Sequence, residues 1–345
     1  MVSIDEVARA AGVSTATVSR ALSGRGHVSE KTRARVDIAA KSLGYVVSSS
    51  ASSLASGRTR NIGVLLPFLD RWFFSTVLAG IADRLMRDGY DITLYSLSVE
   101  REQRDSIFEE FLRRRRVDGV IAISLELDAD EIQRLCELDL PVVTIGGPNP
   151  GLSSLTVDDM ALAQLATEHL IALGHRRIAH IGADPESDVD FHIPGRRRVG
   201  FEQTLEAAGI PIYPNLYEPG DFTIEGGFHS AKQLLGRPGP QPTAVFASSD
   251  EMAIGTMLAA RELGYRVPED LSVVGIDGHE LGAFFQLTTV DQAPRAQGER
   301  AAEAILAALE ETGAENRMTV AVEPQPYQLV VRGSTARPSA DTAAG

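Results

Sequence analysis

Residues 14–22 read Ser-Thr-Ala-Thr-Val-Ser-Arg-Ala-Leu, and the stretch has the pattern of a short helix with one apolar face. Ser14 is a residue type that caps helices, because its side-chain oxygen accepts a hydrogen bond from a free backbone N–H group. Val18, Ala21 and Leu22 recur at three- and four-residue spacing and predict the inner face. The outer face is then predicted to carry Thr15, Ala16, Thr17, Ser19 and Arg20.

A second short helix is predicted immediately before this one. Ser3 and Glu6 have the spacing of a capping box, which opens a helix with an inner face at Ile4, Val7, Ala8 and Ala11. Gly12-Val13 is the predicted tight turn between the helices. Two short helices joined by a Gly-containing turn are typical of a helix-turn-helix, whose second helix enters the major groove of DNA. The alternative interpretation is a packed helix pair with no nucleic-acid role.

A third helix and the local charge favour the DNA interpretation. Ser29 and Thr32 lie at the predicted start of this helix, Gly44 lies at its end, and Val36, Ala39, Ala40 and Leu43 should face inward. Residues 1–60 carry a net charge of +5 while the whole chain carries −14, which leaves −19 for the remainder. A basic head on an acidic body indicates phosphate contact at one end only.

Several motifs of the head together resemble the LacI/GalR (lactose-repressor) family of bacterial transcription regulators. They are Ile4-Asp5-Glu6-Val7-Ala8, Ala11-Gly12-Val13-Ser14, Thr17-Val18-Ser19-Arg20, Val28-Ser29, Thr32-Arg33 and Leu43-Gly44-Tyr45. The resemblance covers nearly all of the chain and ends near Ser334. It implies sequence-specific DNA binding, with contacts from Ser3, Ser14, Thr15, Ala16, Thr17, Ser19, Arg20, Ser29, Thr32, Arg33, Tyr45, Ser48 and Leu54.

Residues 48–60, which follow the predicted DNA-binding domain at 1–47, are rich in serine. One interpretation is a flexible linker. The resemblance implies instead a hinge that becomes helical on DNA, and serines are poor residues for the interior of an isolated helix. Leu54 would then be the wedge in the minor groove, because it is the only large apolar residue placed for that role. Val47-Ser48 stands where the family usually has Pro-Asn.

The composition is that of a globular protein: 43% of the 345 residues are hydrophobic and 23% are charged. No apolar run approaches the roughly 20 residues of a membrane span. We therefore expect no membrane association, and the helix cap at Ser3 leaves no room for a signal peptide. The single cysteine, Cys136, excludes an intramolecular disulfide and suits a reducing cytoplasm, so a cytoplasmic location is expected.

From residue 61 onward apolar strands alternate with amphipathic helices, which predicts an α/β fold with doubly wound parallel sheets. The strands are expected at 62–66, 92–97, 120–123, 142–145, 155–157, 178–181, 244–247, 272–276 and 327–331. The helices are expected at 75–88, 103–116, 129–138, 160–173, 196–208, 225–235 and 251–263.

The resemblance implies that this core, residues 61–335, is periplasmic-binding-protein-like and serves ligand binding and dimerisation. Lobe 1 would comprise residues 61–160 and 292–322, and lobe 2 would comprise 161–291 and 323–335. Residues 336–345 are small and polar and are predicted to form a disordered tail.

Ligands of open parallel sheets bind beyond the carboxyl ends of the strands. Trp72, Phe73 and Phe74 follow the first strand of the core and concentrate three of the chain's 20 aromatic residues. Core packing explains one or two of them, but an aromatic platform also suits the apolar faces of a sugar. The pair Phe73-Phe74 resembles the aromatic pair of the family's ligand site.

The second lobe supplies the other expected ligand residues. The resemblance assigns Arg197 as the ligand-gripping arginine, Phe222 as a second aromatic wall and Asp277 as the acceptor for hydroxyl groups. Ser249 stands where the family often has Asn, with Asp250 expected to cap the next helix. Gln292 lies at a crossover between the lobes and can reach the cleft. Arginine, carboxylate and aromatic faces together suit a polyhydroxylated ligand.

We therefore predict a homodimeric repressor of sugar-utilisation genes that is released from a palindromic operator by a small sugar. A glucoside or short oligosaccharide is favoured over a purine. The alternatives are a corepressor-dependent regulator of the same fold and a solute-binding protein for sugar transport. An enzyme is not expected, because no nucleophile elbow, phosphate loop or dinucleotide fingerprint occurs. No metal site and no cofactor are expected, since the seven histidines lack zinc spacing.

Overall fold

The computed structural model describes residues 2–23, 27–45, 58–97, 101–114, 116–183, 193–310 and 322–339. The chain divides into two compact units, one formed by Met1–Asn61 with Arg116–Asp118 and the other by the remaining residues. Ser48 and Leu54, the two hinge residues expected to contact DNA, lie outside the described residues.

The head is a helix-turn-helix with a third helix, as predicted. Its helices are α1 (Ile4–Ala11), α2 (Thr15–Ser23) and α3 (Glu30–Leu43). They bury a shared core formed by Val7, Ala8, Ala11, Val18, Ala21, Val36, Ala39 and Ala40. Leu43 was expected to face inward, but it is 37% exposed at the last position of α3. The helix stops there because Gly44 adopts a left-handed conformation with φ of 66°.

The first lobe contains a six-stranded sheet with the order β11-β5-β4-β3-β1-β2. Its strands are β1 (Asn61–Leu66), β2 (Asp91–Ser96), β3 (Gly119–Ile123), β4 (Val142–Gly146), β5 (Ser153–Thr156) and β11 (Val322–Pro324). Its helices are α5 (Trp72–Arg87), α6 (Arg101–Ser106), α7 (Ala129–Glu137) and α12 (Pro294–Glu310). The helix predicted at 103–116 is instead α6 followed by a π-helical turn (Ile107–Phe111) and a 3-10 turn (Leu112–Arg114).

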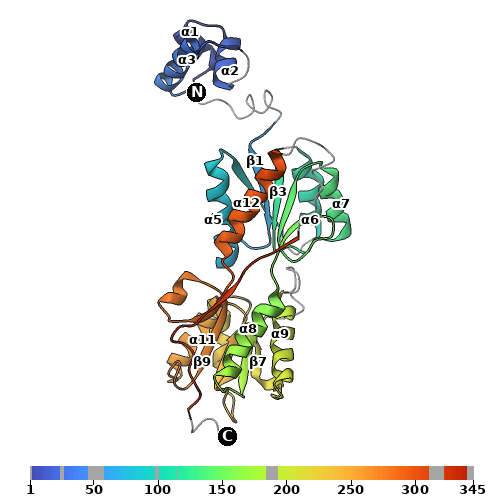
Figure 1. The fold of residues 1–345 in the computed structure, drawn as a ribbon, viewed down its shortest axis with the longest axis vertical. Coiled ribbons are helices and arrows are strands. Elements are labelled where there is room, and N and C mark those ends of the chain that lie inside the picture. The colour runs from blue at the N-terminus through green and yellow to red at the C-terminus, as the bar shows by residue number, and fades with distance from the viewer. Residues whose placement is uncertain are drawn as a thin grey trace. The chain divides into compact units, whose positions relative to one another are not determined.

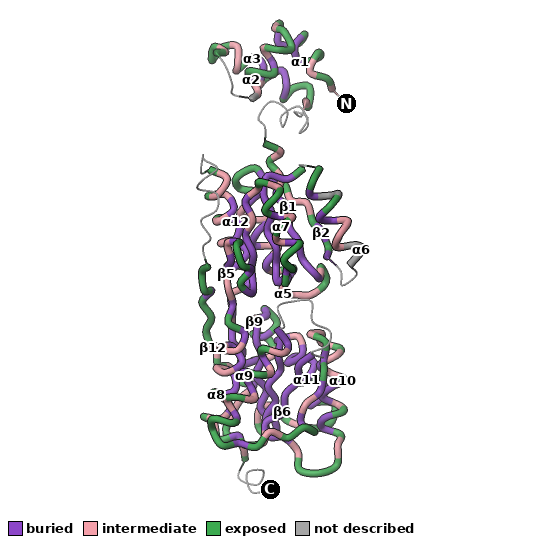
Figure 2. Tube along the Cα trace, turned by 90° about the vertical axis from the view of Figure 1, so that its right-hand side faces the viewer, coloured by how far each residue is buried: buried purple, intermediate pink, exposed green. Residues whose placement is uncertain are grey.

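The second lobe contains a second six-stranded sheet with the order β12-β10-β9-β8-β6-β7. Its strands are β6 (Ile178–Gly182), β7 (Tyr217–Pro219), β8 (Ala244–Ala247), β9 (Ser272–Asp277), β10 (Thr288–Asp291) and β12 (Gln328–Val330). Its helices are α8 (Asp159–Ala172), α9 (Ile193–Ala207), α10 (Ile224–Leu235) and α11 (Asp250–Glu262), with 3-10 turns η4 (Pro214–Leu216) and η5 (Glu280–Ala283). The central strands of both sheets are buried (Figure 2). β12 runs antiparallel to β10, so this sheet is not wholly parallel as predicted.

The chain crosses between the lobes after β10 and again after β11. α12 lies against α5 in the first lobe (Figure 1), and the two helices approach so closely that a Cβ atom at Gly298 would lie 2.0 Å from the carbonyl oxygen of Val77. β11 pairs with β5, and the Gln325 N–H group donates to the Thr156 carbonyl at 2.8 Å. The return to the second lobe therefore begins after Gln325 rather than at residue 323.

The start of the predicted tail also differs from expectation. The Ala336 carbonyl accepts a hydrogen bond from His175 Nε2 at 2.9 Å, and the Ala336 N–H group donates to Ser272 Oγ at 3.0 Å. These contacts fix residue 336 on the second lobe. Among the described residues, no helix is long and apolar enough to cross a membrane.

Candidate functional site

The exposed face of α2 carries the side chains expected to read DNA. Ser14 caps the helix by accepting from the Thr17 N–H group at 3.2 Å. Thr15, Ala16, Ser19 and Arg20 are exposed, whereas Thr17 is half-buried. Arg20 Nε donates to the Ala16 carbonyl at 3.1 Å, so the guanidinium lies along its own helix. The fully buried Val18 beneath them holds this face outward.

The other described DNA-contact candidates lie at helix ends or near them. Ser3 accepts from the Glu6 N–H group at 3.4 Å, and Ser29 accepts from the Thr32 N–H group at 3.3 Å. Both serines therefore set where helices begin while remaining exposed. Arg33 and Tyr45 are half-buried in the head.

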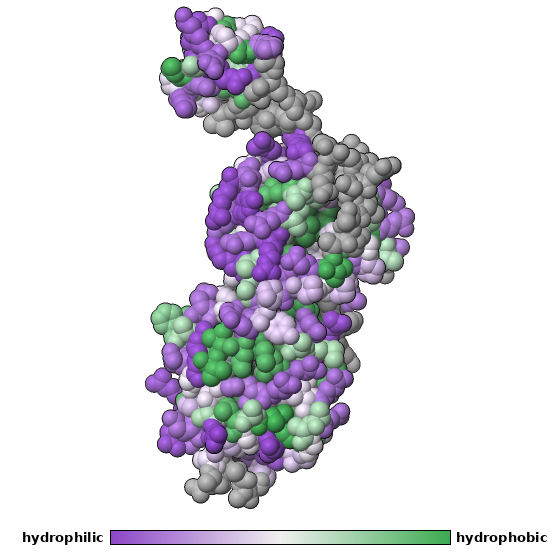
Figure 3. Space-filling view, in the orientation of Figure 1, coloured by the Kyte–Doolittle hydropathy of each residue, from purple (hydrophilic) through white to green (hydrophobic). Residues whose placement is uncertain are grey.

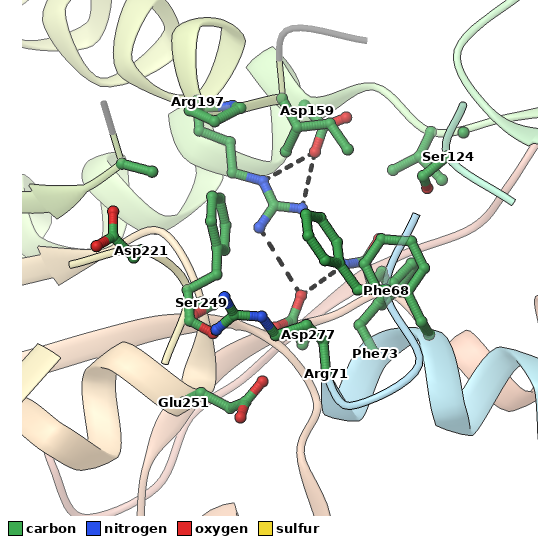
Figure 4. A pocket seen from close by; sticks show the side chains of 18 residues that line it. Phe68, Arg71, Phe73, Ser124, Asp159, Arg197, Asp221, Ser249, Glu251 and Asp277 are labelled. Atoms are coloured by element: carbon green, nitrogen blue, oxygen red, sulfur yellow. Dashed lines mark hydrogen bonds and ion pairs between the residues drawn. The ribbon is translucent and has the colours of Figure 1, made fainter. Parts of the chain in front are cut away.

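A cavity of about 350 Å³ lies between the two lobes, at the carboxyl ends of their strands (Figure 4). Its aromatic lining comes from Phe68, Phe73, Phe74 and Phe222. Its polar lining includes Arg71, Ser124, Asp159, Arg197, Asp221, Ser249, Glu251, Asp277 and Gln292. Of the eight predicted ligand residues, seven line this cavity, and Trp72 is the exception.

Phe73 and Phe74 meet edge to face with ring centroids 5.5 Å apart. Phe74 is buried in the core of the first lobe, whereas Phe73 is half-buried, so Phe73 offers more surface to a ligand. Phe222 comes from the second lobe, and its ring centroid lies 5.9 Å from Arg197 Cζ. Trp72 was predicted to widen this platform. It instead stacks on His279 with ring centroids 4.3 Å apart, because it is turned toward the second lobe at the start of α5.

Arg197 lies between two buried carboxylates (Figure 4). Its Nε and Nη2 atoms each lie 2.8 Å from Asp159 Oδ1, and its Nη1 atom lies 3.8 Å from Asp277 Oδ1. Nη1 also donates to the Ser248 carbonyl. Burial raises the pKa of Asp159, and the neighbouring Arg197 charge opposes that rise. The guanidinium is thus oriented by the protein before any ligand arrives.

Asp277 ends β9 with a positive φ of 132°, and Gln292 Nε2 donates to its Oδ1 at 2.7 Å. Burial raises the pKa of Asp277 to about 7. Ser249 lines the cavity as expected, but the helix cap predicted at Asp250 is wrong. Ser249, not Asp250, caps α11, by accepting from the Met252 N–H group at 3.2 Å. Asp250 is fully buried, and its Oδ2 accepts from the N–H groups of Gly278 and His279.

Comparison with known proteins identifies the head and the core separately. Residues 3–48 match the model for bacterial regulatory proteins of the lacI family, and residues 167–335 match a periplasmic binding protein-like domain. The HTH-type transcriptional repressor CytR of Escherichia coli (strain K12) is 35% identical over 343 residues, which cover 96% of this chain and 95% of CytR. The chain belongs to the lacI family of bacterial regulatory proteins.

Solved structures agree with this membership and with the fold. The lac repressor dimer bound to operator and the anti-inducer ONPF aligns with a TM-score of 0.82 and 29% identity, covering 97% of this chain and 99% of that one. A complex of the transcriptional regulator CelR with cellobiose aligns with a TM-score of 0.67 and 29% identity, covering 97% and 100%. As a lacI-family member, the chain is a DNA-binding transcriptional regulator with a two-lobed core.

Eleven of the eighteen residues that line the cavity of this lacI-family member were missed from sequence, among them Phe68, Arg71, Asp159 and Glu251. Asp159 follows the strand predicted at 155–157, so the rule that ligands lie beyond strand ends could have found it. Phe68 and Arg71 lie just after β1 and had the same positional signal. Glu251 lies four residues after β8 and had this signal too, but the direction of its side chain depends on how α11 faces the other lobe.

Proposed function

We propose that this lacI-family regulator is a homodimeric repressor that a small sugar releases from a palindromic operator. The observation that carries the proposal is the cavity itself, where half-buried Phe73 and Phe222 flank the ionic pair of Arg197 and Asp159 with Asp277 beside it. Aromatic faces suit the C–H surface of a sugar ring, and hydroxyl groups can both donate to Asp277 and accept from Arg197. The CelR–cellobiose complex, a similar structure, supports a carbohydrate in this type of core.

The charges around the cavity favour a neutral, donor-rich effector over an anion. Asp159, Asp221, Glu251 and Asp277 contribute four carboxyl groups against the two guanidinium groups of Arg71 and Arg197, and Asp159 already lies against Arg197. A phosphate or carboxylate group on the ligand would face this negative charge at short range, in a site that excludes much of the water. A neutral sugar avoids this repulsion and supplies hydroxyl donors to carboxylate acceptors.

The mechanism follows from the two lobes. Sugar binding changes their relative position, and this shift displaces the paired first lobes and weakens the joint grip of two heads on the operator. Apolar side chains gather on one face of the second lobe (Figure 3). In the same lobe Leu258, Leu281 and Phe284 are exposed at 38%, 37% and 82%. Exposed apolar surface of this kind supports a homodimer.

Thermal-shift screening of the full-length protein against neutral monosaccharides and disaccharides tests the proposed effector class. A neutral sugar should raise the melting temperature, and its 6-phosphate should not. The same sugar should release operator DNA, whereas a sugar that tightens operator binding would reverse the sign and indicate a corepressor. Stabilisation by phosphorylated sugars alone would contradict the proposed class.

Arg20→Ala should relax operator specificity at one symmetric position in each half-site. Arg20 is exposed on α2 and can pair bidentately with a guanine, which contributes about 1–3 kcal/mol of discrimination. Selection of binding sites from a random DNA library, with the wild type alongside, measures the effect. An unchanged base preference at every position would show that Arg20 does not read a base. Arg9→Ala on α1, which also removes an exposed arginine, serves as the control.

Leu54→Ala should weaken operator binding and leave sugar-induced stabilisation unchanged. The reason is that a leucine wedge compensates for the few kcal/mol needed to unstack a base step in bent DNA. Operator titration by fluorescence anisotropy at one fixed salt concentration checks this expectation. Equal operator affinities for the variant and the wild type would remove Leu54 from the proposed interface.

A further inference from the structure

Trp72 joins the two lobes through its side chain. It is the first residue of α5 in the first lobe, and it contacts two consecutive residues of the second lobe, His279 and Glu280. The indole and imidazole rings are stacked, with centroids 4.3 Å apart and planes inclined by 21°. The indole Nε1–H group donates to Glu280 Oε2 at 2.5 Å. The tryptophan thus uses both its face and its polar edge across the gap between the lobes.

A second set of contacts lies beside this one and nearer to the cavity. Arg71 Nη1 donates to the Phe222 carbonyl at 3.2 Å, and the Trp72 N–H group donates to Glu251 Oε2 at 3.4 Å. Arg71, Phe222 and Glu251 line the cavity, whereas the three residues of the stacked contact do not. Trp72, His279 and Glu280 therefore lie at the rim of the cavity, behind the residues that a ligand would touch.

The half of this contact that belongs to the second lobe is held in place by its own lobe. Asp250 Oδ2 accepts from the N–H groups of Gly278 at 3.0 Å and His279 at 2.8 Å. His279 Nδ1 accepts from the Leu281 N–H group at 3.0 Å, which fixes the imidazole ring. A partner that is already ordered loses little conformational freedom when Trp72 docks on it, so the contact can form without help from a ligand.

We propose that Trp72, His279 and Glu280 form a clasp that holds the two lobes together at the rim of the cavity, and that this clasp must open to admit the effector. The opening step rests on the proposed function, because it assumes that an effector binds in this cavity. The contact itself requires neither operator nor sugar. Effector entry would then break the stacking of Trp72 on His279 before the ligand reaches the cavity residues.

Trp72 is the only tryptophan in the chain, so its fluorescence reports the clasp directly in the full-length protein. The test compares wild type with the double variant His279→Ala/Glu280→Ala, using acrylamide as the quencher. The double variant should show a Stern–Volmer constant higher by about two-fold or more, because the indole becomes free to open into solvent. Its emission maximum should also move to longer wavelength. His279→Phe, which keeps an aromatic partner and Glu280, should remain close to wild type.

Glu262→Ala is the matched control, because Glu262 pairs with Lys232 at 2.7 Å within the second lobe and contacts neither the clasp nor the cavity. It should leave Trp72 emission unchanged. Hydrogen exchange provides the second measurement: the amides of Trp72, which donates to Glu251 across the lobes, and of Ser75, which donates to the Arg71 carbonyl, should exchange faster in the double variant. Identical quenching, emission and exchange in wild type and double variant would overturn the clasp. Glu280→Ala alone, at an exposed position, decides the matter if the double variant does not fold.

Discussion

Arg197→Ala is expected to lower the free energy of unfolding by about 3–5 kcal/mol, because it leaves buried charge without a partner. Arg197 is 4% exposed and contacts Asp159 through two nitrogen atoms, while the Ser248 carbonyl loses its donor as well. Asp159 and Asp277 would remain buried with no cation between them. Urea unfolding followed by circular dichroism measures this loss.

Arg198→Ala is the matched control for this experiment. Arg198 is the next residue of the same helix. Its Nε atom lies 2.8 Å from Glu202 Oε1, and the Arg198 side chain is 38% exposed. An exposed ion pair of this kind contributes about 0–1 kcal/mol. If Arg197→Ala costs no more than Arg198→Ala, the buried ionic cluster does not stabilise the second lobe as inferred.

Asp277→Asn is expected to abolish sugar-induced operator release while the protein still folds and binds operator. Asparagine keeps the shape and tolerates the positive φ at this position. It replaces one acceptor oxygen by a donor, so a ligand hydroxyl that donates to Asp277 loses its partner. Titration of the operator complex with sugar should show no release for the variant at sugar concentrations that release the wild type. A release curve that overlays wild type would place the ligand elsewhere.

The same variant should change how stability depends on pH. Burial raises the pKa of Asp277 from its ordinary value of 3.8 to about 7, so the folded state holds a proton that the unfolded state releases. The stability that this group contributes is present at low pH and is lost as the pH rises through about 7. Asp277→Asn cannot ionise at this position. The melting temperature of the variant minus that of the wild type should therefore be larger at pH 8 than at pH 5. A constant difference across this range would contradict the raised pKa.

Most of the fold followed from local rules in the sequence. The cap at Ser3 and the glycine at 44 placed the head helices close to their observed limits, and the alternation of strands and helices predicted nine of the twelve sheet strands. The short strands β7, β10 and β11 and the helix α12 were missed. The strand-end rule together with the family resemblance predicted that Phe73, Arg197, Phe222 and Asp277 lie at one site, and all four line the cavity. These features depend on residues that are close together in sequence or on the shared polarity of parallel strands.

The remaining features depend on contacts between distant segments. Trp72 looked like a ligand platform, but its direction is set by His279 and Glu280, which lie more than 200 positions further along the chain. Asp250 looked like a helix cap, but backbone N–H groups of Gly278 and His279 bind its carboxylate and leave Ser249 to cap α11. Single-sequence patterns contain no information about such pairings.

The most direct test of the proposed function is an anisotropy titration of the full-length protein on its selected operator, with and without the neutral sugar that gives the largest thermal shift. The proposal predicts that this sugar lowers operator affinity for wild type but leaves it unchanged for Asp277→Asn. Operator affinity that stays the same for wild type at sugar concentrations that stabilise the protein would contradict the coupling between cavity and operator.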